Sequence, residues 1–187
     1  MPAAILPDMP DEAMGALDLW IRLRGARSMP SRSDFRPLDW RAWMSDISIV
    51  ELHDGDPRYF VALHGGRTQE HIGVNFHKKY LETGLTPDTR ALALEPYRES
   101  ERTGLPTFST MAPRLYRGVT YTLWRLVMPF TDDTPDGGPQ RVDRFVVWVG
   151  AASRRPYDFD TLYKSLQSNV EDRADMADRV SLSVLSV

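Results

Sequence analysis

Residues 119–130 read VTYTLWRLVMPF, and the fold class follows from how their side chains alternate. Successive side chains of a β-strand point to opposite faces of a sheet, so a strand over these residues has two distinct faces. One set of side chains contains Tyr121, Leu123, Arg125 and Val127, and the other contains Thr122, Trp124, Leu126 and Met128. The alternation predicts a strand with one face in the core.

More strands are predicted on either side of residues 119–130. They cover residues 47–52, 59–63, 107–111 and 142–150. The first two are joined by the turn sequence His53-Asp54-Gly55-Asp56-Pro57, which predicts a hairpin. Strands that follow one another without intervening helices pair antiparallel, so we expect an α+β fold with helices on one face of an antiparallel sheet. Residues 180–184 also alternate like a strand, whose partner the sequence leaves open.

Helices are predicted before, between and after these strands. They are expected over residues 11–24, from Pro37 onward, over 68–72 as a single turn, over 88–102 and over 159–170. Gly25 supplies a left-handed residue just past the first of them. Pro96 predicts either a kink in the helix over residues 88–102 or a late start of that helix. Residues 28–37 contain two prolines and several side chains that form local hydrogen bonds, so no regular element is expected there.

The chain of 187 residues has the length of one domain with a few extra elements. Prolines at positions 2, 7 and 10 predict a disordered N-terminus over residues 1–10. The remaining divisions are an N-terminal helical cap over 11–46, a core over 47–150, and a C-terminal helix and tail over 151–187. Residues 131–140, which are rich in Asp, Gly and Pro, form a predicted flexible insert.

Composition excludes several classes of function. The chain has no cysteine, which rules out disulfides, thiol nucleophiles, iron–sulfur clusters and thiolate zinc sites. Its net charge of −3 is unlike the basic excess of proteins that bind nucleic acids or anionic membranes. The sequence contains no apolar run of membrane-spanning length and no N-terminal signal peptide, so we expect a cytoplasmic protein. The 20 arginines against 3 lysines indicate a compositional bias and give no single arginine a role.

One segment resembles a known family. Residues 19–37 read LWIRLRGARSMPSRSDFRP. They resemble the opening signature of a bacterial PAS-like family, in which a tryptophan-bearing helix runs into a Gly-x-Arg-x-Met-Pro-x-Arg-x-Asp-x-x-Pro stretch. Looser matches are residues 59–66, Tyr97 with residues 104–106, and residues 122–129, so the resemblance covers about residues 12–150.

The resemblance implies a five-stranded antiparallel sheet that encloses a cavity with its flanking helices. It further implies a stand-alone sensory module without catalytic activity, which binds a small molecule or a partner protein and signals through its terminal helices. A homodimer formed through those helices is expected. Two alternatives stay open: a PAS-fold dimerisation scaffold without a ligand, and a small α+β cavity enzyme that uses a His–acid pair.

Seven residues are candidates for contact with a ligand: Arg67, His71, Phe76, Tyr97, Tyr121, Trp124 and Trp148. Arg67 follows two glycines and precedes a short helix, so its guanidinium and the first N–H groups of the helix are suited to an anion. The aromatic residues bring apolar area, and Tyr or Trp adds a polar tip. For each candidate the alternative is a structural role, in a surface salt bridge or in the core.

No cofactor, metal or catalytic residue is assigned from the sequence. The histidines at 53, 64, 71 and 77 have spacings that match no metal-binding motif, and neither a metal nor haem is expected. The absence of cysteine excludes a cysteinyl flavin adduct, and the cofactor is left unknown. Arginines between residues 22 and 41 alternate with aromatic residues as in a nucleic-acid surface, but aspartates interrupt them, so no nucleic-acid partner is expected.

Overall fold

The computed structural model describes residues 9–116, 119–132, 141–156 and 182–184. For Asp88 and for residues 111–122, 152–156 and 182–184, the description is limited to the backbone. Within these ranges the chain has an α+β fold. The predicted helix over residues 159–170 and most of the predicted insert lie outside the described residues, as do residues 1–8 of the expected N-terminal tail.

The strands form one antiparallel sheet. They are β1 (Ile47–Leu52), β2 (Tyr59–His64), β3 (Lys79–Tyr80), β4 (Thr107–Tyr116), β5 (Val119–Thr131), β6 (Val142–Pro156) and β7 (Leu182–Val184). Their order across the sheet is β3-β2-β1-β6-β5-β4-β7. The five longer strands confirm the strands predicted between residues 47 and 150. The sheet has seven strands in place of the expected five, because the short strands β3 and β7 add to its two edges.

The described helices are α1 (Asp11–Arg24), α2 (Gly66–Ile72) and α3 (Pro87–Thr103), with single 3-10 turns at Arg32–Asp34 and Leu81–Gly84. The helix predicted over residues 11–24 is confirmed, and Gly25 has the positive φ of 59° that ends it. α3 is helical on both sides of Pro96, so the late start considered for it is wrong. Thr86 caps its first turn, and its side chain accepts a hydrogen bond from the Thr89 N–H. None of these helices has the length and apolar character needed to cross a membrane.

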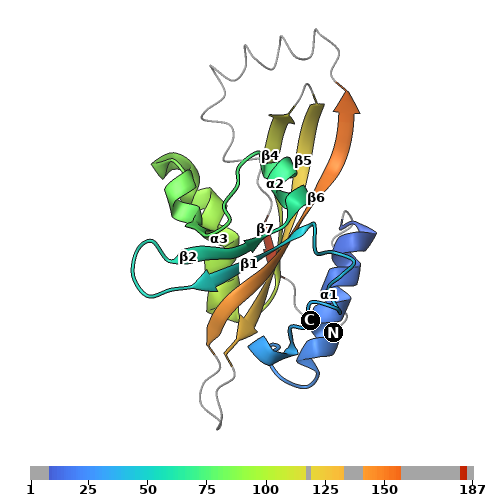
Figure 1. Cartoon of the computed structure of the whole chain (residues 1–187), viewed down its shortest axis with the longest axis vertical. Coiled ribbons are helices and arrows are strands. Elements are labelled where there is room, and N and C mark those ends of the chain that lie inside the picture. The colour runs from blue at the N-terminus through green and yellow to red at the C-terminus, as the bar shows by residue number, and fades with distance from the viewer. Residues whose placement is uncertain (1–8, 117–118, 133–140, 157–181, 185–187) are drawn as a thin grey trace.

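The helices cover both faces of the sheet: α2 and α3 share one face, as predicted for the helices of the core, and α1 of the predicted N-terminal cap covers the other. α1 lies on one side of the twisted sheet and α3 on the other (Figure 1). The side chains of β6 show the same division, because Val146 and Trp148 join the hydrophobic cluster of α1, whereas Phe145 and Val147 join that of α3. The sheet is therefore the middle layer of three.

The segment between α1 and β1 also differs from the prediction. No helix begins at Pro37, because residues 37–46 form consecutive turns with hydrogen bonds between residues three apart, such as Trp43 N–H to the Trp40 carbonyl. These turns bury Trp40 completely and let it stack on Phe35, with ring centroids 5.6 Å apart. The only helical geometry among residues 28–46 is the 3-10 turn at Arg32–Asp34, where no regular element was expected.

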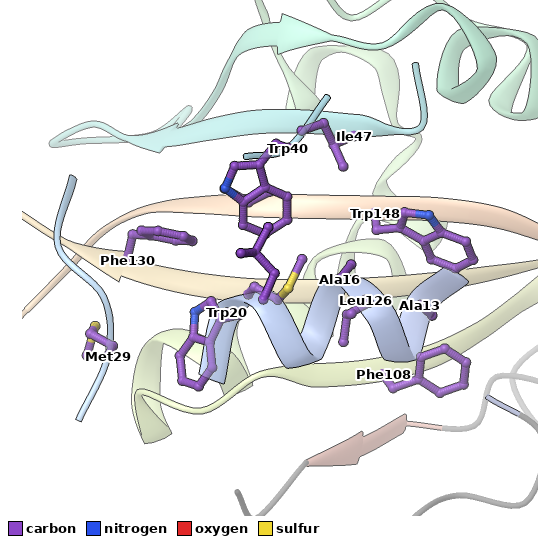
Figure 2. Packing of buried hydrophobic residues seen from close by; sticks show 13 residues of the cluster. Ala13, Ala16, Trp20, Met29, Trp40, Ile47, Phe108, Leu126, Phe130 and Trp148 are labelled. Carbon is purple, nitrogen blue, oxygen red and sulfur yellow. The ribbon is translucent and has the colours of Figure 1, made fainter. Parts of the chain in front are cut away.

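The α1 side of the sheet holds a dense hydrophobic cluster. Figure 2 shows Ala13 and Ala16 of α1 facing the sheet, with Leu126 and Phe108 of the strands nearby. Trp20 has no exposed surface, and its indole N–H donates to the Pro129 carbonyl on β5 over 2.8 Å. The small alanines bring the helix close, and the indole hydrogen bond fixes its position along the strand.

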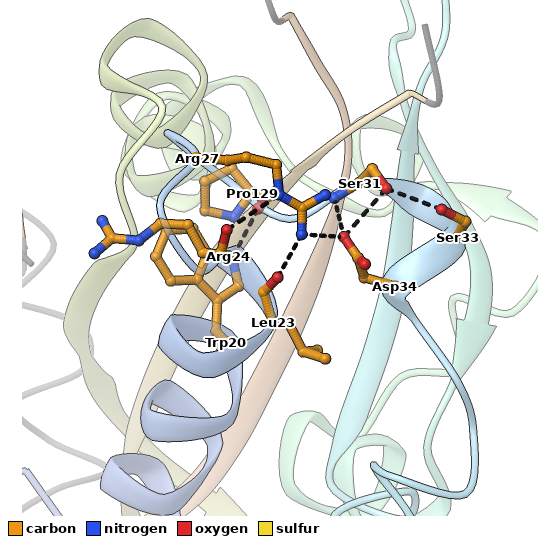
Figure 3. A network of polar contacts seen from close by, with 8 residues as sticks. All are labelled: Trp20, Leu23, Arg24, Arg27, Ser31, Ser33, Asp34 and Pro129. Atoms are coloured by element: carbon orange, nitrogen blue, oxygen red, sulfur yellow. Dashed lines mark hydrogen bonds and ion pairs between the residues drawn. The ribbon is translucent and has the colours of Figure 1, made fainter. Parts of the chain in front are cut away.

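The residues that carry the family resemblance hold α1 against the sheet. Arg27 donates to the carbonyls of Leu23 and Arg24 in the last turn of α1 and pairs with Asp34 over 2.8 Å (Figure 3). Asp34 also accepts from the backbone N–H of Ser31. The carbonyl of Pro30 accepts from the Thr131 N–H at the end of β5. This segment therefore has a structural role, and its arginine is committed to closing the helix end.

Candidate functional site

The opposite face of the sheet contains a partly open cavity of about 100 Å³. It lies between β1, β2, β5 and β6 and the segments that carry α2 and α3. Its lining residues are Ser48, Val50, Val61, His64, Thr68, Ile72, Val74, Phe76, Leu81, Gly84, Leu85, Ala93, Leu94, Tyr97, Arg125, Val147 and Val149. Apolar walls with a few polar groups are typical of small-molecule sites.

Close backbone approach places α2 over this cavity. A Cβ atom on Gly65 would lie 2.5 Å from the carbonyl oxygen of Ser45 and 2.7 Å from that of Ile47, so only glycine fits there. The N–H groups of Arg67 and Thr68, at the start of α2, both donate to the Ser45 carbonyl. The short helix is therefore tied directly to the segment that enters β1, and Thr68 is held inside the cavity wall.

Pro96 interrupts the hydrogen bonding of α3 where the helix contacts the sheet. Pro96 has no N–H, so the helix lacks the hydrogen bond that this residue would donate four positions back. Side chains of the sheet donate to carbonyls of α3 in the same region: Arg125 to Ala93 over 2.8 Å, and Thr107 to Pro96 over 3.0 Å. These contacts bring the cationic side chain of β5 under α3, at one end of the cavity.

Arg125 is the most unusual lining residue. It is only 6% exposed, and its Nε–H donates to the Ser109 hydroxyl over 3.3 Å. Its guanidinium carbon lies 5.3 Å from the centroid of the Tyr97 ring. No carboxylate lies within ion-pairing distance of it in the part of the chain that the structure describes. Burying a cation without a counter-charge costs several kcal/mol, by order of magnitude.

The electrostatics of Arg125 and Tyr97 are coupled. Burial lowers the pKa of the Arg125 guanidinium, and the nearby Tyr97 hydroxyl partly offsets this effect. Burial raises the pKa of Tyr97, and the charge of Arg125 acts in the opposite direction. The hydroxyl of Tyr97 therefore stays protonated beside a buried cation, and a negative ligand atom would be stabilised by both groups.

His64 and Ser48 form a second polar group on the floor of the cavity. The Nε2–H of His64 donates to the Val74 carbonyl over 3.2 Å, so its Nδ1 is left to accept from the Ser48 hydroxyl over 2.9 Å. Burial lowers the pKa of His64; the hydrogen bond to Val74 raises it and His77 lowers it further. The neutral ring is therefore favoured.

Thr68 completes the polar set. Its side chain is 1% exposed, and its hydroxyl oxygen has no hydrogen-bond partner among the described residues. Buried hydroxyl groups nearly always have a partner. Because Thr68 lines the cavity, a polar atom of a bound molecule would supply one.

The structure brings two of the seven predicted ligand contacts into the cavity. Phe76 and Tyr97 both line it, and Phe76 packs edge-on to His64 with ring centroids 6.0 Å apart. The backbone of Tyr121 pairs with Arg114 of β4, and its side chain lies outside the described residues.

Arg67 and His71 lie on α2 but outside the cavity lining. The guanidinium of Arg67 is more than half exposed and pairs with Asp46 over 2.9 Å, which is the surface salt bridge considered as its alternative role. The helix N–H groups expected to face an anion are already bonded to Ser45. His71 lies near Asp46 as well. Burial raises the pKa of the Asp46 carboxyl, and the charges of Arg67 and His71 partly oppose this effect.

Trp124 and Trp148 lie on the wrong face of the sheet for this cavity. Trp148 belongs to the cluster packed against α1, and Trp124 packs on the same cluster. The alternation along β5 explains the error, because Arg125 and Trp124 are neighbours in sequence and must face opposite sides. Sequence reasoning recognised the alternation but not which of the two faces holds the cavity.

The polar groups that line the cavity were the residues missed: Arg125, His64, Ser48 and Thr68. One signal was present, since Arg125 lies between Leu123 and Val127 on one face of an otherwise apolar strand. A charged residue at an apolar strand position is rarely buried without a specific reason. The abundance of arginine in the chain obscured this signal.

The described residues contain no group of three or more His, Asp or Glu side chains placed to hold a metal ion. The histidines that are close in sequence separate in space: His53 bonds the Tyr80 hydroxyl at the hairpin, whereas His64 lines the cavity. The side chains that line the cavity in the described chain include one imidazole and no carboxylate.

Comparison of the chain with protein-family models, with curated proteins and with solved structures finds no match.

Proposed function

We propose that this protein is a PAS-like sensory module that binds a small molecule in the cavity beneath α2 and α3 and has no catalytic activity. The single observation that carries the proposal is the cavity itself, in which Arg125, Tyr97, His64 and Thr68 interrupt apolar walls. A core that served only for stability would be filled at this position, because protein interiors leave few voids larger than a water molecule.

The order of the elements supports the PAS-like part of this proposal. Along the chain, two strands are followed by a helical region and then by three long strands, which is the order that the resemblance implies. The strands join in one antiparallel sheet. The extra edge strands β3 and β7 do not interrupt it. The proposed family therefore depends on this order and on the Met29-Pro30 segment.

The layered fold provides a route by which a ligand could be sensed elsewhere. Arg125 faces the cavity from β5, and the next residue in the strand, Leu126, packs into the α1 cluster. A shift of β5 caused by a ligand therefore reaches α1 through one residue. The signal is proposed to leave through α1 and the chain beyond β6 toward a partner protein.

The alternatives have less support in the described residues. A cavity enzyme using a His–acid pair needs a carboxylate beside His64, and no described lining residue supplies one. A dimer formed through α1 needs a free apolar face, whereas Ala13, Ala16, Leu19 and Trp20 of α1 are buried against the sheet.

Filling the cavity tests the proposed function. Ala93 lines the cavity from α3, so Ala93→Leu is expected to occupy much of its volume while preserving the helix, because leucine is also a good helix former. Ligands would be sought by native mass spectrometry and by thermal shift with a panel of small acids, amides, alcohols and aromatic compounds. We expect at least one compound to stabilise the wild-type protein and to lose its effect with Ala93→Leu.

Ala91→Leu is the matched control, since Ala91 lies on the exposed side of the same helix. It should leave every thermal shift unchanged. If no compound of the panel binds the wild-type protein, or if Ala93→Leu binds as well as wild type, the cavity is not a ligand site and the proposal fails.

A further inference from the structure

We infer that the ligand of this cavity is a small aliphatic monocarboxylate, whose carboxylate pairs with Arg125 and whose hydrocarbon part lies over Val147 and Val149. This inference rests on the proposed function, since it names the class of molecule for the same cavity.

The donors of Arg125 are only partly used. A guanidinium carries five N–H groups. The hydrogen bonds to the Ala93 carbonyl and the Ser109 hydroxyl use one on Nη1 and the one on Nε. A third N–H is assigned to the Tyr97 hydroxyl, whose interaction raises the pKa of Arg125 against the effect of burial. No other acceptor for this side chain is found in the ranges that the structure describes. Two donors at a buried cation match the two oxygens of a carboxylate.

Two other partly buried arginines in the described residues have counter-charges. Arg144 on β6 contacts Asp143 over 2.8 Å and Glu51 over 3.5 Å, and Arg58 pairs with Glu101. Arg125 is more buried than either and has no such partner among the described residues. Arg125 therefore differs from these two arginines in lacking a carboxylate partner among the described residues.

The register of the sheet sets the shape of the ligand. Arg125 on β5 is opposite Val149 on β6, and Val147 on β6 is opposite Ser48 on β1. The cavity floor therefore runs from a cation, across two valines, to the pair of Ser48 and His64. Two inter-strand spacings, about 10 Å, separate the backbones of β5 and β1. A charged head at one end and an aliphatic body over the valines fit this floor.

The size and charge of the cavity restrict the ligand further. An engineered cavity of about 150 Å³ holds one benzene molecule, so a cavity of about 100 Å³ suits a molecule of at most about that size, such as propionate or butyrate. Arg125 is the only cation in the described lining, so a second carboxylate would be buried without a partner. Inorganic anions would leave the apolar walls uncovered. A monocarboxylate satisfies both restrictions, and a hydroxyl on its chain would give Thr68 its missing partner.

The test compares an acid with its neutral isostere on the full-length protein. Butyrate and butyramide have nearly the same shape, and isothermal titration calorimetry would measure the dissociation constant of each. We expect butyramide to bind about 10- to 100-fold more weakly than butyrate, which is the range for hydrogen bonds to a charged partner. Succinate, as the dicarboxylate, should bind more weakly than butyrate by a similar factor.

Variants assign the effect to one side chain. Arg125→Met keeps a long side chain without charge and should reduce butyrate affinity about 10- to 100-fold without weakening butyramide. Tyr97→Phe removes only a hydroxyl and should give a smaller loss, which provides a second reading if Arg125→Met folds poorly. Arg67→Met is the control, because that arginine lies near the cavity but outside its lining, and butyrate binding should be unchanged.

The outcomes separate this inference from the proposed function. Equal binding of butyrate and butyramide overturns the carboxylate and leaves the cavity a ligand site. Unchanged butyrate binding in Arg125→Met overturns it as well. If no carboxylate from acetate to hexanoate binds, the inference fails. The proposed function fails with it only if none of the neutral compounds of the panel binds either.

Discussion

The two faces of the sheet are built from the same strands but differ in what they bury. The face under α1 is packed with tryptophan, phenylalanine and aliphatic side chains, including Trp20 and Trp40, which have no exposed surface. The face under α2 and α3 buries a cation and leaves a cavity of about 100 Å³. Alternate residues of β5 and β6 serve each face in turn. The α1 face therefore carries the denser packing, and the other face holds the cavity in which we propose that a ligand binds.

The largest effect is expected on the α1 face. Trp20→Ala removes a fully buried indole and its hydrogen bond to Pro129, and should lower the free energy of unfolding by about 3–5 kcal/mol. Denaturation by urea, followed by far-UV circular dichroism, would measure this loss. Leu38→Ala is the control, since Leu38 is 73% exposed and its truncation should cost less than about 0.5 kcal/mol. A loss below about 1 kcal/mol for Trp20→Ala would show that α1 is not part of the folded core.

The sequence predicts most of the strands and helices because their apolar periodicity is strong. The helix at 11–24 and the five long strands are each marked by periodic side chains with glycine or proline near their ends. The segment from Pro37 to Asp46 was predicted wrongly because its apolar spacing suits a helix, whereas burial of Trp40 against Phe35 and Phe130 selects consecutive turns. Tertiary packing overrides local preference there.

The candidate site was harder to predict than the fold. Alternation shows that Arg125 and Trp124 face opposite sides, but not which helix covers each side. That information comes from contacts far apart in sequence, such as Trp20 with Pro129 and Arg125 with Ala93. The pairing of residues 182–184 with β4 is likewise a long-range contact. The sequence therefore suggested the aromatic residues Trp124 and Trp148 as ligand contacts, whereas Arg125 is the residue that lines the cavity.

A smaller effect is expected from pH on the cavity face. Burial lowers the pKa of His64 in the folded protein, so the unfolded chain binds a proton more readily between the two values. This contribution reduces stability as the pH falls below the unfolded value near 6.5 and stops changing below the folded value. His64→Gln removes this dependence, and urea denaturation of both proteins from pH 8 to pH 5 would isolate it. A wild-type protein that loses no more stability than His64→Gln over this range would contradict the prediction.

The smallest change in stability is expected for Arg125, the residue proposed to contact the ligand's carboxylate. Arg125→Met loses hydrogen bonds to Ala93 and Ser109, but it also removes a charge buried without a described counter-ion, so the two effects offset and the free energy of unfolding should change by less than about 1 kcal/mol. Arg144→Met should cost more, because it leaves Glu51 and Asp143 without their cation. Urea denaturation of both variants without added carboxylate gives the comparison. A loss for Arg125→Met as large as that for Trp20→Ala would make the guanidinium a structural element and would remove the difference between the two faces. A near-zero loss together with impaired butyrate binding would instead show that the guanidinium serves ligand binding.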